Sequence, residues 1–305
     1  MKENVMKMRS LRTKLILAFV LVITIPIVLL SFVAYRTTSN SFEEMLVQSS
    51  LVQSSLVSES INHYMSIYGR ATSLLSNNIN VKMARSATSY RTGLFQSFED
   101  FIKEYDEVKN VYVGYEDTTF LIYPSVTLPA GYDPRDRLWY TDAKSKNELI
   151  WTAPYQDASD AAITVVSAGA PVTTPSGAFE GVLALDLDIT KLADMANDVQ
   201  IGKYGYVALL GQDNKFFTHP DAALIGEEIP VEGLKGFVEG NTSGQYRYTY
   251  NGLQRTAILT TLEDLGWKIL AVVDEREIQE ESNAMLRTIL FIASVLLVLA
   301  IGAAF

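Results

Sequence analysis

Two uninterrupted apolar runs stand near the two ends of the chain. Residues 15–35 read LILAFVLVITIPIVLLSFVAY and residues 288–305 read TILFIASVLLVLAIGAAF, and neither run contains a charged side chain. A helix that crosses a lipid bilayer needs about 20 mainly apolar residues. The pattern therefore predicts two transmembrane helices, one at residues 15–35 and one at residues 288–305.

The charges before the first run predict its orientation. The only acidic residue there is Glu3, and the basic residues are Lys2, Lys7, Arg9, Arg12 and Lys14. Because basic flanks stay in the cytoplasm, residues 1–14 are expected inside the cell and the long segment between the two runs outside it. The alternative is a cleaved signal peptide, whose apolar region spans only about 7–15 residues. The longer run here favours an uncleaved anchor.

The second apolar run ends where the chain ends, at Phe305. A natural protein seldom stops inside a membrane span without a tail. We therefore expect that the second transmembrane helix is truncated and that an output domain follows it in the complete protein. A simple C-terminal tail anchor is the alternative.

The segment after the first run has helical periodicity. Residues 36–90 contain no proline, and apolar residues recur at helical spacing from Val57 to Leu75. We expect one long extracellular helix over residues 36–90, and a connecting helix over residues 276–287 that leads into the second span. The tandem LVQSSLVQSS, which begins at Leu46, shifts the apolar stripe and leaves serines on it, because a helical turn takes about 3.6 residues.

Between these helices the hydrophobic period becomes that of strands. Segments rich in β-branched and aromatic residues follow residue 109 and are separated by turn residues. The tyrosines of QYRYTY alternate on one face and precede Asn251-Gly252, a strong signal for a type I′ hairpin. We therefore expect an α+β fold with two successive antiparallel-sheet modules, at residues 91–200 and, smaller, at residues 201–275.

Composition narrows the classes of function. The net charge is −10, and every acidic residue except Glu3 lies between the two apolar runs. Such a surface argues against nucleic-acid binding, which uses Lys and Arg against phosphates. The absence of cysteine excludes disulfides and thiolate chemistry, and the two histidines, His63 and His219, are far apart in sequence. Abundant carboxylates leave a paired-acid hydrolase open on composition alone, but no catalytic motif forms, so we expect no enzyme, cofactor or metal.

Residues 131–143, GYDPRDRLWYTDA, are predicted to form a loop that concentrates recognition side chains. An arginine guanidinium binds a carboxylate through two parallel N–H bonds, and a tryptophan indole offers one N–H donor. If the backbone is extended, Arg137 and Trp139 share a face and converge on one anion. The alternative is a structural ion pair of Arg137 with Asp133 or Asp142, and the residues alone favour neither.

The same segment carries a family resemblance. YDPRDRLWY, followed by APYQD and GVLALDLDI, resembles the amino-acid-binding branch of the double Cache sensor domain of bacterial chemoreceptors and sensor kinases, over roughly residues 36–287. The resemblance implies two PAS-like modules, with the ligand site in the membrane-distal module, residues 91–200. The ligand-binding residues that it implies are Tyr132, Arg137, Trp139, Tyr140, Tyr155, Asp157 and Asp186.

The resemblance also implies roles for these residues. The α-carboxylate of an amino acid is expected to be held by Arg137, Trp139 and Tyr132. The α-ammonium is expected to be held by Asp186, with Asp157 and Tyr155. Tyr140 would line the pocket, and Arg135 would be structural.

By this resemblance, the chain is expected to be the sensor of a two-pass methyl-accepting chemotaxis receptor that binds free L-amino acids outside the cell. The expected partners are a second copy, in a homodimer formed through residues 49–75, and downstream chemotaxis proteins that contact the missing cytoplasmic part. The alternatives are a sensor of amines or another small metabolite, the sensor of a histidine kinase or cyclic-dinucleotide enzyme, and, more distantly, a structural envelope protein.

Overall fold

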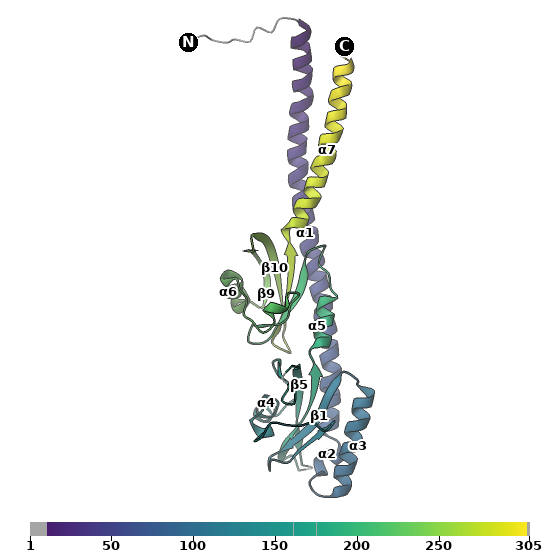
Figure 1. Ribbon diagram of the computed structural model, residues 1–305, viewed down its shortest axis with the longest axis vertical. Helices are drawn as coiled ribbons and strands as arrows, with labels where there is room; N and C mark the ends of the chain where they lie inside the picture. Colours follow the sequence, from purple (N-terminus) through teal and green to yellow (C-terminus); the bar gives the residue numbers. More distant parts are fainter. Residues whose placement is uncertain (1–10, 161, 175, 304–305) are drawn as a thin grey trace.

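The computed structural model describes residues 11–160, 162–174 and 176–303 (Figure 1). The helices are α1 (Leu11–Ser76), α2 (Ile79–Met83), α3 (Thr88–Glu104), η1 (Pro134–Asp136), α4 (Leu138–Lys146), α5 (Thr190–Asn197), η2 (Ala222–Leu224), α6 (Glu232–Gly240) and α7 (Glu275–Ala303). The strands of the first module are β1 (Val108–Tyr115), β2 (Phe120–Tyr123), β3 (Ile150–Trp151), β4 (Tyr155–Gln156), β5 (Thr164–Thr173) and β6 (Phe179–Asp188). Those of the second are β7 (Tyr206–Leu210), β8 (Phe216–Thr218), β9 (Ser243–Tyr250), β10 (Leu253–Leu262) and β11 (Trp267–Asp274).

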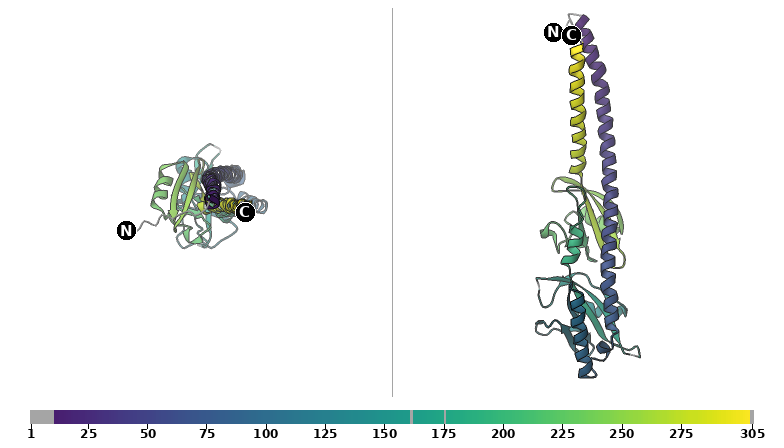
Figure 2. Two further views of the ribbon diagram at one scale, coloured as in Figure 1. Left: turned by 90° about the horizontal axis from the view of Figure 1, so that it is seen from above. Right: turned by 90° about the vertical axis from the view of Figure 1, so that its right-hand side faces the viewer.

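The molecule is a long rod built along one helix. α1 has 66 residues and passes both sheets, and α7 lies beside its first part, so that the start of α1 and the end of α7 lie at the same end of the rod (Figure 2). Among the described helices, α1 and α7 each contain a segment that is long and apolar enough to cross a membrane. The predicted cytoplasmic residues 1–10 and the last two residues of the second span lie outside the described ranges.

The helix after the first span is shorter than expected. α1 ends at Ser76, and the segment predicted as one helix up to Tyr90 also contains α2 and the start of α3. Asn78 has extended backbone angles, and its side-chain oxygen accepts a hydrogen bond of 2.8 Å from the backbone nitrogen of Asn80. Asparagine favours such caps because its short side chain competes with the helical backbone bonds. The connecting helix expected at residues 276–287 is continuous with the second span in α7.

Each module contains one antiparallel sheet. The strand order is β2-β1-β6-β5-β3 in the first, where β4 also pairs with β5, and β8-β7-β11-β10-β9 in the second. The predicted hairpin joins β9 to β10, with φ of 51° at Asn251 and 76° at Gly252. Positive φ at both central positions is what a type I′ turn requires. The structure and the predicted α+β class with two antiparallel-sheet modules agree.

The two faces of each sheet have different partners. One face packs on α1, in a core that contains Ile61 and Tyr68 of α1 together with Leu185 and Leu187 of β6. The opposite face carries a short helix, α4 on the first sheet and α6 on the second (Figure 1). Strand side chains alternate between faces, so residues next to each other in β6 contact either α1 or the α4 side.

Polar contacts join α1, α7 and the second sheet where the two helices meet. Ser39 of α1 and Ser282 of α7 share a hydrogen bond of 2.6 Å. Arg247 of β9 forms ion pairs with Glu43 of α1 and, at 2.7 Å, with Glu275 of α7. The second module is therefore attached to both of the long helices, α1 and α7.

Two serines of the LVQSS tandem lie on the face of α1 that packs on the second sheet. Ser50 and Ser54 are fully buried. The Ser50 hydroxyl donates to the carbonyl of Leu46 at 2.6 Å, and the Ser54 hydroxyl donates to Thr260 of β10 at 3.1 Å. Ser50 and Ser54 therefore lie on the buried stripe, as the sequence predicted. Their small size lets α1 lie close to β10.

We expect Ser54→Leu to destabilise the fold and Ser55→Leu, an exposed position in the same tandem, to have little effect. The added leucine at position 54 overpacks the contact between α1 and β10, at a cost of about 1–3 kcal/mol, whereas an exposed substitution changes stability by about 0.5 kcal/mol or less. The measurement is the melting temperature of each variant in detergent micelles. Equal melting temperatures for the two variants would contradict the close packing at Ser54.

Candidate ligand-binding site

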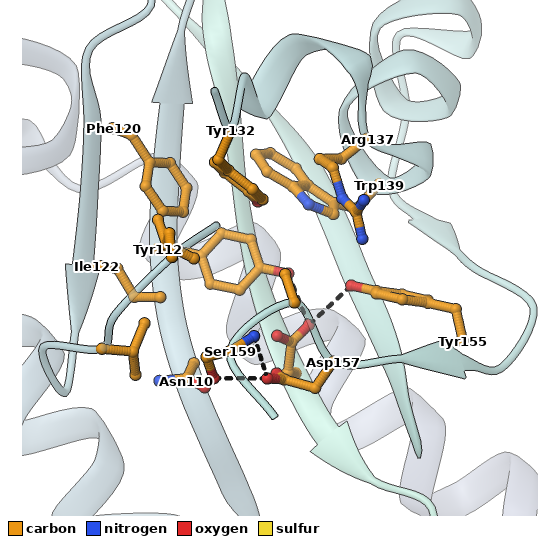
Figure 3. A pocket seen from close by; sticks show the side chains of 14 residues that line it. Asn110, Tyr112, Phe120, Ile122, Tyr132, Arg137, Trp139, Tyr155, Asp157 and Ser159 are labelled. Carbon is orange, nitrogen blue, oxygen red and sulfur yellow. Dashed lines mark hydrogen bonds between the residues drawn. The ribbon is translucent and has the colours of Figure 1, made fainter. Parts of the chain in front are cut away.

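A small, partly enclosed cavity lies in the first module, on the face of its sheet away from α1 (Figure 3). The cavity is lined by Asn110, Tyr112, Phe120, Ile122, Val126, Leu128, Tyr132, Arg137, Trp139, Tyr155, Asp157, Ala158, Ser159 and Asp186. Six of the seven residues expected from the sequence are thus brought together, from segments as far apart as residues 132 and 186.

The segment of residues 131–143, predicted as a loop, is mostly helical. Asp133 caps η1 by accepting a hydrogen bond of 2.9 Å from the backbone nitrogen of Arg135, and Pro134 occupies the first position of η1. Arg137 is extended, with φ −87° and ψ 146°, and α4 begins directly after it. Arg137 and Trp139 therefore do not share the face of an extended strand. They meet at the cavity because Arg137 precedes the N-terminus of α4 and Trp139 lies in its first turn.

Trp139 forms the inner wall of the cavity and is only 1% exposed. Its ring lies 4.9 Å from that of Tyr112 in an edge-to-face arrangement. A Cβ on Gly114 would lie 3.0 Å from the Trp139 ring, and a Cβ on Gly169 would lie 2.7 Å from the Trp139 carbonyl. These two glycines leave the room that α4 and its indole need against the sheet.

Tyr140 does not line the cavity, contrary to the expectation. It is buried on the other side of Trp139, and its ring makes an edge-to-face contact with Phe179 at 6.0 Å. The reason is the helix, because consecutive residues in the first turn of α4 point in different directions. Tyr140 therefore packs α4 onto the sheet.

Arg137 is a cation without a recorded ion pair in the described part of the chain. Its guanidinium carbon lies 5.7 Å from the ring centres of both Tyr132 and Tyr155. The carboxylate of Asp133 instead pairs with Arg135 at 2.7 Å, and Arg135 also donates to the carbonyl of Glu116. The geometry favours an anion-binding role for Arg137 over the structural ion pair, and gives Arg135 the structural role.

Asp186 is the buried carboxylate of the site. Three hydroxyls donate to its Oδ1, from Ser167 at 2.5 Å, Tyr112 at 2.6 Å and Tyr155 at 3.3 Å. Burial raises the pKa of Asp186 to about 6, although the hydrogen bonds from Ser167 and Tyr112 lower it. No group among the described residues donates a hydrogen bond to its Oδ2.

Asp157 is already neutralised within the protein. Lys109 forms an ion pair with its Oδ1 at 3.1 Å, and the same oxygen accepts hydrogen bonds from Ser159 and from the backbone of Asp160. Burial raises the pKa of Asp157, but the hydrogen bonds from Ser159 and Lys109 outweigh burial, so the pKa lies below its usual value. Asp157 stays ionised, and its second oxygen has no recorded donor in the described ranges.

The remaining cavity residues were not identified from the sequence. They are Asn110, Tyr112, Phe120, Ile122, Val126, Leu128, Ala158 and Ser159. Asn110 and Tyr112 belong to NVYVGYED, and alternation along this strand places them on one face with a spacing of two. That signal was available, but the sequence does not show which face of the strand meets the cavity.

The charges of the site are arranged in two places. Arg137 lies with Tyr132 and Tyr155, and the carboxylate of Asp157 lies at a distance from its guanidinium (Figure 3). The carboxylate of Asp186 lines the same cavity. This arrangement suits a small ligand with an anionic and a cationic group. Within the described ranges, no group of three or more His, Cys, Asp and Glu side chains is placed to hold a metal ion.

Residues 35–282 match the Cache domain family in its dCache_1 form. Among curated proteins, the methyl-accepting chemotaxis protein McpB of Bacillus subtilis (strain 168) is 28% identical over 295 residues, which are 96% of this chain and 43% of McpB. The chain therefore spans less than half the length of the curated relatives that it matches.

Solved structures show the same architecture. The ligand-binding domain of Mlp24 with asparagine superposes with a TM-score of 0.59 at 27% identity, covering 82% of this chain and 99% of that domain. The ligand-binding domain of the Pseudomonas fluorescens chemoreceptor CtaA in complex with L-serine has a TM-score of 0.59 at 23% identity, covering 79% of this chain and 99% of that domain. With a family match over most of its length and this shared fold, the chain belongs to the double Cache family of sensor domains.

Proposed function

We propose that this chain is the sensor and membrane anchor of a chemoreceptor, and that its first module binds free L-amino acids. The observation that carries the proposal is the placement of Arg137, which has no recorded ion pair, in the same cavity as the buried carboxylate of Asp186. A zwitterion pairs with both, as charges in a protein interior require. The similarity to Mlp24, whose domain was solved with asparagine, supports an amino acid as the ligand.

The same geometry weighs against the alternatives. A simple amine has no carboxylate and leaves the Arg137 guanidinium without a partner. The curated relatives are methyl-accepting chemotaxis proteins, which supports a chemotaxis output over a kinase or cyclic-dinucleotide output. They also support a binding domain over an enzyme or a structural envelope protein. In this proposal, downstream chemotaxis proteins contact a cytoplasmic part beyond Phe305.

We propose that the receptor works as a homodimer in the membrane. The face of α1 that the rest of the chain leaves uncovered carries exposed apolar side chains, among them Met45, Val52, Leu56 and Leu74. Met45, Val52 and Leu56 are spaced by seven and four residues, as in the seam of a coiled coil. A second copy of α1 is the partner that this spacing fits.

In a titration of the chain with amino acids, Arg137→Ala and Asp186→Ala are expected to abolish detectable binding. Each leaves a charge of the buried ligand unpaired, at a cost of about 2–5 kcal/mol, which lowers affinity by roughly 30- to 5,000-fold. The measurement is isothermal titration calorimetry in detergent micelles. The control is Arg135→Ala, which removes a neighbouring cation outside the cavity and is expected to bind normally. Wild-type affinity in both Arg137→Ala and Asp186→Ala would show that the site is wrongly assigned.

Affinity for the ligand is expected to fall as the pH drops below about 6. Ligand ammonium pairs with ionised Asp186, whose pKa without ligand is about 6. The ionised fraction limits the apparent affinity, which is therefore about tenfold lower at pH 5 than at pH 7. The stability of the ligand-free fold has the opposite dependence on pH. Because the folded pKa lies above the unfolded value, the contribution of Asp186 to stability is present at low pH and is lost as the pH rises through 6.

Calorimetric titrations at several pH values test this dependence, together with melting temperatures of the ligand-free chain. Asp186→Asn removes the titrating group, so its melting temperature is expected to lose the part of the pH dependence between pH 4 and 6. An affinity that is constant from pH 5 to pH 7 would contradict the role of Asp186 as the ammonium partner.

The two-pass topology predicts which parts of the chain are accessible in intact cells. A tag placed before Met1 is expected to be protected from added protease, because the basic residues before the first span hold it in the cytoplasm. The exposed turn at Asn241 is expected to be cut. Protease mapping with mass spectrometry gives both results. A protease-sensitive tag, or a mature chain that begins after Tyr35, would contradict the topology.

A further inference from the structure

The proposed amino-acid site contains a buried acceptor that the protein leaves unpaired. Asn110 lines the cavity and is 2% exposed, and its Oδ1 has no hydrogen-bond partner in the described part of the chain. Its amide nitrogen donates a long bond of 3.5 Å to the carbonyl of Pro124, so that the Oδ1 is the atom left without a partner. Buried polar atoms without a partner are rare and costly, so this oxygen indicates a donor on the ligand.

The sheet register places this oxygen beside the main carboxylate of the site. Asn110 of β1 is directly opposite Asp186 of β6. Side chains directly opposite on one face have Cβ atoms about 4.5–5.5 Å apart. Tyr112, two residues further along the same face of β1, donates to Asp186 at 2.6 Å. Asn110 is therefore next to the group that is proposed to hold the ligand ammonium.

A primary ammonium group has three N–H donors and needs three acceptors. Asp186 and Asp157 each have an Oδ2 for which no donor is recorded among the described residues, since all their recorded bonds are to Oδ1. We propose that Asn110 Oδ1 is the third acceptor of the ligand ammonium, an inference that rests on the proposed amino-acid function. Asn110 thus binds the ammonium end of the ligand, which every amino acid shares.

With Asn110 assigned to the ammonium, the apolar wall faces the ligand side chain. This wall is formed by Phe120, Ile122, Val126 and Leu128. Phe120 and Ile122 lie on the opposite side of the cavity from Arg137 (Figure 3). The wall contains no charged residue, so a charged ligand side chain would be buried there without a partner. The ligand class is L-amino acids with uncharged, mainly aliphatic side chains.

The test is a calorimetric titration of the whole chain in detergent micelles with alanine, valine, aspartate and lysine. Asn110→Leu keeps a similar volume and removes the acceptor. It is expected to lower the affinity for alanine and the affinity for valine by the same factor. That factor is about 10- to 100-fold, as for the loss of a hydrogen bond to a charged group. Wild-type protein is expected to bind alanine and valine more tightly than aspartate and lysine.

A matched control separates loss of the acceptor from general damage to the fold. The Tyr140 hydroxyl is also buried without a recorded partner, but Tyr140 lies outside the cavity. Tyr140→Phe is expected to bind like wild type. Removal of the unpaired Tyr140 oxygen is not expected to lower the melting temperature of ligand-free Tyr140→Phe. Asn110→Asp keeps an acceptor and is expected to retain more affinity than Asn110→Leu.

The outcomes distinguish this inference from the proposed function. If wild-type protein binds no amino acid, the proposed function is wrong. If wild type binds alanine and valine and Asn110→Leu binds both equally well, only the role of Asn110 is wrong. A loss confined to one of the two ligands would also overturn that role. A preference for aspartate or lysine would overturn the ligand class.

Discussion

The burial of the Asp186 carboxylate is the constraint on which the site depends. Burial raises its pKa to about 6 even though hydroxyls of Ser167, Tyr112 and Tyr155 donate to one of its oxygens. A buried carboxylate is favourable only when it is both paired and hydrogen-bonded. In the described part of the chain no basic side chain forms an ion pair with it. In the proposed function, a cationic ligand group supplies that pairing, and the carboxylate of the same ligand supplies the partner of Arg137.

One sheet connects this site to the long helix α1. Asp186 faces the cavity, whereas its neighbours Leu185 and Leu187 pack in the core shared with α1. The ligand site and the long helix are therefore separated by the thickness of a single sheet. In the second module, Arg247 forms ion pairs with both α1 and α7. Because packed interfaces shift between discrete arrangements, the proposed sensor would transmit a change in β6 to α1 through the core that they share.

The sequence predicted the features that local chemistry determines. The turn at Asn251-Gly252 needs positive φ at both positions, and the structure has it. The two apolar runs and the residue types of the site were also predicted from the sequence. Tertiary packing determined the rest. α1 ends at Ser76 and Asn78 caps a new helix, α2, inside the segment predicted as one helix. The first turn of α4 directs Tyr140 away from the cavity. The importance of Asn110 depends on its register against β6, which no pattern in the sequence specifies.

The central claim is that one cavity holds both charges of an amino acid at once. The most direct measurement compares calorimetric titrations of the chain with valine, with isobutylamine and with isovalerate. The amine lacks the partner of Arg137, and the acid lacks the partner of Asp186. The account predicts that valine binds and that neither half-ligand binds detectably, alone or together. Binding of isobutylamine with the affinity of valine would show that the carboxylate is not recognised, and would contradict the claim.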